Sequence, residues 1–226
     1  MRVWDIHPGY LDRQRLLGEH RELHGVVAVT TGGLNGYAAH PEVKRWAGLG
    51  WACAMRHRLL AAEMAFRGYR DRTPVRLRRA PGRWPTTFID EPGAQFGLLA
   101  DKYADERRGR IPLPKSAQEL WAHHKYSVLA RSQSAYRGLG VRVSALPRGE
   151  IDELAVELVA WLHKPPSAGN LRNALQHMWG HVEAGPDGFA DCSPGTALKR
   201  IQRAALAENN RYLLEQTALT ELGPWM

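Results

Sequence analysis

A glutamate among arginines, close to the start of the chain, is the first feature that could do chemistry. Glu22 ends the basic stretch RQRLLGEHRE, which begins at Arg13, and only twelve residues precede that stretch. A free α-amine has a pKa of about 7.7–8.0, so part of it is a neutral nucleophile at cellular pH. A carboxylate beside such an amine could transfer protons. Met1 and Glu22 are therefore candidates for amine-based catalysis, and the alternative is that Glu22 is an ordinary surface acid paired with Arg15 or Arg21.

The element that must position Glu22 is a helix with one apolar side. Asp12 is a suitable N-cap for a helix from Arg13 to about Thr30. At 100° per residue, Leu16, Leu23 and Val27 fall on one side and predict the buried stripe. The other side carries Gln14, Arg15, Gly18, Arg21 and Glu22. A small residue in the middle of that polar side would let a partner approach the backbone closely.

Positive charge is concentrated in the first half of the chain. Residues 1–115 hold 20 Lys/Arg against 12 Asp/Glu, whereas residues 116–226 hold 11 of each. The stretch from Phe66 to Trp84 has seven arginines and a single acid, and its prolines disfavour helix. We expect this arginine-rich stretch to bind a phosphate backbone rather than to be only a solvated loop. Its candidate contacts are Arg67, Arg70, Arg76, Arg78, Arg79 and Arg83.

A milder basic stretch, residues 121–149, has five Lys/Arg, two histidines and no acid. His124, Lys125 and Arg131 are its candidate nucleic-acid contacts. His177 and His181 have the i, i+4 spacing of a ligand pair, but the sequence shows no third ligand, so we predict no metal site. The two cysteines, Cys53 and Cys192, are far apart in sequence and predict free thiols.

Helical patterns dominate the chain, and alternating strand patterns are scarce, the best being VRVSAL at 141–146. The sequence therefore predicts an all-α protein. The expected helices cover 13–30, 41–66 with a possible break at Gly48–Gly50, 92–109, 116–132, 150–164, 168–182 and 195–219. No stretch is apolar enough to span a membrane, and the amino terminus lacks a signal-peptide pattern, so we expect a cytoplasmic protein.

The N-terminal part resembles a known family. The pattern Q-x-x-L-x-E-x-R-E-L from Gln14 to Leu23, the start MRVWDIHPGYLD and the stretch HRLLAAEMAFRGY at 57–69 are similar to pyrimidine-dimer DNA glycosylases of the phage endonuclease V type. In that family the N-terminal α-amine attacks C1′ of the damaged nucleotide and a helix glutamate promotes the reaction. The resemblance implies catalytic roles for Met1 and Glu22, and DNA contacts by Arg2, Gln14 and Arg21, with Arg15 beside them.

The implied chemistry needs no cofactor, and we predict none. Attack on C1′ expels the base and leaves an imine, which acidifies the 2′ hydrogen so that a carboxylate can start β-elimination. The phage enzyme reacts through a threonine amine after losing its methionine. Here the bulky Arg2 predicts that Met1 is retained.

The C-terminal part resembles a domain of unknown function that occurs fused to thiouracil-desulfidase-like proteins. The similar segments are 122–140, 162–182 and 210–219. The two resemblances predict a glycosylase-like domain at 1–115 and a helical domain at 116–226. They leave two functions open: a DNA glycosylase with AP-lyase activity on damaged pyrimidines, or a protein that binds or processes modified or photodamaged tRNA.

Overall fold

The computed structural model describes residues 1–32, 38–75, 82–103, 107–147, 150–182 and 188–226. These residues form eleven α-helices and two short 3-10 helices, and none of them lies in a β-strand. The predicted all-α class is confirmed.

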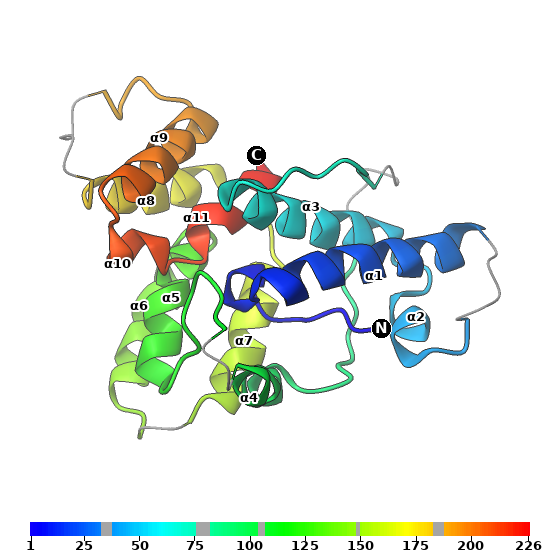
Figure 1. The fold of residues 1–226 in the computed structure, drawn as a ribbon. Helices are drawn as coiled ribbons and strands as arrows, with labels where there is room; N and C mark the ends of the chain where they lie inside the picture. The colour runs from blue at the N-terminus through cyan, green and yellow to red at the C-terminus, as the bar shows by residue number, and fades with distance from the viewer. Residues whose placement is uncertain (33–37, 76–81, 104–106, 148–149, 183–187) are drawn as a thin grey trace.

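The N-terminal elements are built around two long helices that run side by side, α1 and α3 (Figure 1). The first elements are η1 (Pro8–Tyr10), α1 (Arg13–Gly32), α2 (Pro41–Trp46) and α3 (Gly50–Phe66). The Asp12 carboxylate accepts from the Arg15 N–H at 2.7 Å, which confirms the expected N-cap. The predicted break after α2 is also present, because Gly48 adopts a φ of +73° that L-residues other than glycine rarely adopt.

The remaining helices complete the molecule. They are α4 (Pro92–Lys102), α5 (Ala117–Leu129), α6 (Gln133–Ser144), α7 (Asp152–Leu162), α8 (Ala168–Trp179), α9 (Pro194–Ala207), α10 (Arg211–Leu214) and α11 (Ala218–Glu221), followed by η2 (Gly223–Trp225). Helix α6 contains most of the stretch with the best strand alternation. It is helical because Ser132 caps it and because Leu139 and Val143, four residues apart, are buried on one face.

Two hydrophobic cores hold the chain together. The first contains Leu16 and Leu23 of α1, which are fully buried as expected, and also takes Leu154 and Leu158 from α7. The second lies between α5 and the helices from α8 to α11. Residues from both expected domains therefore share the first core, and the boundary near residue 115 remains a prediction.

A buried carboxylate connects three segments that are far apart in the sequence. Glu63 of α3 is fully buried and receives Arg67 and Arg110, each at 2.7 Å, and the Thr220 hydroxyl at 2.8 Å. Burial by itself would raise the pKa of the Glu63 carboxyl, but the two guanidinium groups outweigh burial and hold that pKa well below its usual range.

Replacing Glu63 with Gln is expected to destabilise the protein by about 3–5 kcal/mol near pH 7, because two guanidinium groups lose their buried counter-charge. A carboxyl with a depressed pKa stabilises the fold above its unfolded pKa of about 4.3 and loses this contribution as the pH falls further. The difference from wild type should therefore shrink in acid, as measured by urea unfolding at several pH values. Glu157→Gln, which removes an exposed pair with Arg142, is the matched control and should cost at most about 1 kcal/mol. A small, pH-independent effect of Glu63→Gln would contradict the prediction.

Candidate active site

The first residues run as an extended segment beside α1 (Figure 1) and are held by side chains rather than by a neighbouring strand. The backbone N–H of Arg2 donates to Glu22. The N–H of Val3 donates to Glu42 at 3.0 Å, and the N–H of Asp5 donates to Gln95 at 2.9 Å. Because three helices each supply an acceptor, the position of the amino terminus is fixed by tertiary contacts.

This arrangement brings the α-amine to the glutamate that the sequence singled out. The Met1 nitrogen lies 4.0 Å from Glu22 Oε1, and the Glu22 side chain is 40% exposed. One bridging water or a small rotation would connect the two groups for proton transfer. The neighbouring acid on α1, Glu19, is different, because its carboxylate is buried and receives two hydrogen bonds from Arg56. Of these two acids, only Glu22 is therefore available to a substrate.

A surface hollow of about 340 Å³ opens beside Glu22, the acid that faces the Met1 amine. Its lining comprises Arg2, Trp4, Gln14, Arg15, Gly18, Glu19, Arg21, Glu22 and Lys102. A Cβ at Gly18 would meet no atom within 4 Å, so the absence of a side chain there leaves the space beside Glu22 open. A volume of this size is comparable to that of a small-ligand pocket.

A second hollow of about 430 Å³ continues along α1. Its lining comprises Asp12, Arg13, Gln14, Leu17, Arg21, Arg107 and Arg108. Because Gln14 and Arg21 line both hollows, we treat the two as one feature, the α1 groove. Sequence reasoning missed Lys102, Arg107 and Arg108 as members of this site. The signal was present as the basic end of the segment 92–109, but nothing local indicated that it would face α1.

The candidate DNA contacts from the N-terminal resemblance all line the α1 groove. Each of them also has a partner within the protein. Arg2 pairs with Asp90 at 2.7 Å, Arg15 pairs with Asp12 at 2.6 Å, and Gln14 accepts from Arg107 at 2.8 Å. Arg21 donates to the Leu17 carbonyl oxygen of its own helix at 3.3 Å, and its side chain is exposed.

The arginine-rich stretch divides into three groups. Arg70 and Arg83 are exposed, while Arg76, Arg78 and Arg79 lie outside the described residues. The Arg67 guanidinium is turned inward, where it donates to Glu63 and to the carbonyl oxygens of Pro8, Gly9 and Leu11. We leave Arg67 out of the proposed nucleic-acid surface.

The candidate contacts of the second half are mostly internal. His124 is buried, and burial lowers the pKa of its imidazole to about 3, which keeps the ring neutral. Arg131 is buried against Glu221 and also donates to the carbonyl oxygens of Leu162 and Lys164 at the end of α7. Lys125 lies over the rings of Tyr126 and Tyr212 and is half-buried. Of the three, only Lys125 retains access to solvent.

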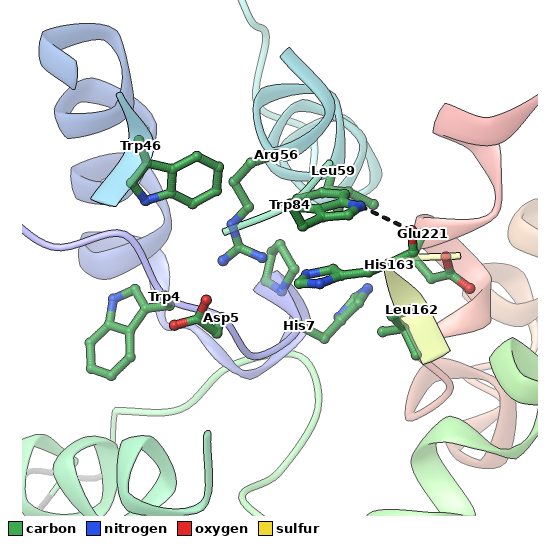
Figure 2. A pocket seen from close by; sticks show the side chains of 11 residues that line it. Trp4, Asp5, His7, Trp46, Arg56, Leu59, Trp84, Leu162, His163 and Glu221 are labelled. Atoms are coloured by element: carbon green, nitrogen blue, oxygen red, sulfur yellow. Dashed lines mark hydrogen bonds between the residues drawn. The ribbon is translucent and has the colours of Figure 1, made fainter. Parts of the chain in front are cut away.

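A separate internal cavity lies where the N-terminal segment meets the end of α7 (Figure 2). The Trp84 ring stacks on His163 at a centroid distance of 4.0 Å, and its indole N–H donates to the His163 carbonyl oxygen at 3.0 Å. The volume is only about 20 Å³, enough for roughly one water molecule. This cavity cannot hold a nucleobase, and we do not consider it a substrate site.

Comparison with known families matches two regions of the chain. Residues 1–77 match the profile of the family described as pyrimidine dimer DNA glycosylase, and residues 125–185 match a family described as protein of unknown function. Both resemblances derived from the sequence are thereby confirmed. The first match supports a DNA-repair glycosylase at the level of the family, and with it a DNA substrate. No curated protein and no solved structure matches the chain. Within the described residues, no helix has the length and apolar character to cross a membrane.

Proposed function

We propose that this protein is a DNA glycosylase with AP-lyase activity on damaged pyrimidines, and that the Met1 α-amine is its nucleophile. The observation that carries the proposal is the 4.0 Å separation between the Met1 nitrogen and Glu22 Oε1 at the edge of the α1 groove. The match of residues 1–77 to pyrimidine dimer DNA glycosylases supports it independently.

The proposed reaction has two steps. The lone pair of the amine forms a bond to C1′ while the glycosidic bond breaks, and the base leaves with the bonding electrons. Loss of a proton from nitrogen and opening of the sugar ring give an imine. Glu22 then removes a 2′ hydrogen, the electrons form a C–C double bond, and the 3′ phosphate leaves. The opened ring oxygen takes up the proton that nitrogen loses, and water then hydrolyses the imine to release the protein.

Reductive trapping tests the proposal directly. The full chain is mixed with a duplex that holds one cyclobutane pyrimidine dimer, and borohydride is added. A covalent protein–DNA adduct is expected with the damaged duplex and not with the undamaged one. Parallel reactions use a duplex with an abasic site and UV-treated tRNA. Absence of an adduct with both damaged and abasic DNA would overturn the proposal, and an adduct with tRNA alone would favour the RNA function instead.

The α1 groove is expected to contribute most of the salt-dependent affinity. Alanine at Arg13, Arg21 and Arg108 should weaken DNA binding and flatten the dependence of log K on log salt by up to about 0.9 per lost phosphate contact. Alanine at Lys199, Arg200 and Arg203, three exposed cations of α9 that do not line the groove, is the matched control. Fluorescence anisotropy between 50 and 200 mM salt, where phosphate contacts change the affinity strongly, measures the affinity and the salt slope of both variants. Equal slopes for the two variants would contradict a role for the groove.

A further inference from the structure

Three histidines from α1 and α3 converge on a carboxylate in the first part of the arginine-rich stretch. One ring nitrogen each of His20, His24 and His57 can be chosen so that all lie within 4.8 Å of one another. His57 Nε2 lies 3.2 Å from His24 Nε2 and 3.7 Å from Asp71 Oδ2. His20 Nε2 lies 3.3 Å from Asp71 Oδ1.

These separations fit a tetrahedral metal ion. Zinc binds imidazole nitrogen and carboxylate oxygen at about 2.0–2.1 Å, which places neighbouring ligand atoms of a tetrahedron about 3.3–3.4 Å apart. Three pairs of ligand atoms in the cluster lie near this value, at 3.2, 3.3 and 3.7 Å, and the two that include Asp71 use different oxygens of its carboxylate. The ring nitrogens, which are separated by up to 4.8 Å, must move closer together to enclose one ion.

The hydrogen bonding of the cluster is incomplete without a further group. His20 Nε2 is buried and has no well-directed hydrogen-bond partner among the described residues. His24 Nε2 faces both His57 Nε2, at 3.2 Å, and the Thr73 hydroxyl, at 3.1 Å, although a ring nitrogen has either one hydrogen or one lone pair to share between them. A cation placed between the three nitrogens would use the lone pair of each.

The carboxylate of the cluster also has the support expected of a ligand. The Asp71 carboxylate is oriented by the Thr73 backbone N–H, which donates to it at 2.9 Å. Support of this kind for a ligand is typical of metal sites.

We propose that His20, His24, His57 and Asp71 bind one divalent ion of borderline softness, with Zn²⁺ the best fit. Four protein ligands and no open position are typical of a structural site. At 100° per residue, His20 and His24 lie on one face of α1 and Glu22 on nearly the opposite face. The ion would therefore fasten the start of the arginine-rich stretch onto α1 and α3, and would not take part in catalysis.

The i, i+4 spacing that drew attention to His177 and His181 is also present in His20 and His24. Their third and fourth ligands come from α3 and from the segment after it. Sequence reasoning missed them because the remaining ligands are distant in sequence. The prediction that the protein has no metal site rested only on the pair in α8 and the residues after it.

Cobalt substitution tests the site on the unaltered protein. The full chain is freed of metal with a chelator, dialysed and titrated with Co²⁺, a spectroscopic substitute for Zn²⁺. One equivalent is expected to give the intense visible absorption of tetrahedral cobalt, and one equivalent of Zn²⁺ should remove it. Added Zn²⁺ should also raise the thermal unfolding midpoint, since an ion that binds only the folded chain stabilises it. A wild-type chain that gives neither response overturns the proposal.

Two substitutions identify the ligands. His24→Gln and Asp71→Asn, at partly exposed positions, should each weaken Zn²⁺ binding by at least about 10–100-fold. Loss of a residue that only hydrogen-bonds to a metal ligand already has an effect of this size. His177→Gln, at an exposed histidine of the other pair, is the matched control and should keep one equivalent. Circular dichroism shows whether each variant is folded. Full binding by a folded His24→Gln or Asp71→Asn would refute the ligand assignment, as would loss of binding in His177→Gln.

Discussion

Adding one residue in front of Met1 is expected to abolish borohydride trapping and to leave the DNA affinity within about twofold of wild type. A twofold change is smaller than the usual effect of losing one hydrogen bond. The added residue moves the free amine away from Glu22, and the Met1 nitrogen becomes an amide without a nucleophilic lone pair. The cations of the α1 groove are unchanged, so the electrostatic part of the affinity should persist. Trapping yield and anisotropy on the same lesion-containing duplex measure the two properties separately.

The control for this experiment must allow for a second amine at the site. Lys102 lines the same hollow as Glu22, and a lysine could also form an imine. Lys102→Arg removes that amine, keeps the charge and should still be trapped. The same single residue added after Met226 controls for chain extension as such. Peptide mapping of the adduct should locate it on Met1. An extended chain that is trapped at the wild-type rate would refute the amine mechanism.

Replacing Glu22 with Gln is expected to slow strand cutting by about 10²–10⁴-fold, the usual contribution of general acid–base catalysis. Glutamine retains the oxygen that accepts from the Arg2 N–H, so the N-terminal segment should keep its position. It lacks the basicity needed to remove the 2′ hydrogen. Affinity should hold or rise, because one negative charge leaves a groove lined by arginines. Single-turnover cutting of an abasic duplex measures the elimination step.

A matched surface acid separates catalysis from stability. Glu215, the residue after α10, pairs with Arg211 at 2.7 Å, and Glu215→Gln removes a comparable surface charge. Both substitutions should change the free energy of unfolding by at most about 1 kcal/mol. Only Glu22→Gln should slow cutting. Equal activity of the two variants would show that Glu22 is a surface acid with no chemical role.

Local patterns in the sequence determined most of the helices and the sidedness of α1. The single helix expected over 195–219 was wrong, because the chain breaks there into α9, α10 and α11, with Asn209 at a φ of +48° after α9. Capping, glycine breaks and the 3.6-residue period act over a few residues, so Asp12 at the N-cap, the break at Gly48 and the burial of Leu16 and Leu23 could all be predicted. The polar position of Glu22 followed from the same period. Helix α6 was missed because its sequence alternates over a short stretch, and burial of Leu139 and Val143 against other elements decided its conformation.

Only the tertiary structure decided which charges and histidines meet. A count of arginines could not distinguish Arg131, which is buried against an acid ninety residues away, from Arg21, which is exposed. Burying a guanidinium is possible where a carboxylate and free carbonyl oxygens satisfy it, and such partners come from distant segments. Folding also brings Arg107 and Arg108 to the α1 groove and His20 to Asp71, because these partners are distant in the sequence. The sequence by itself determined the residue types and their faces, whereas the contacts between faces, which set charge exposure and ligand geometry, exist only in the folded chain.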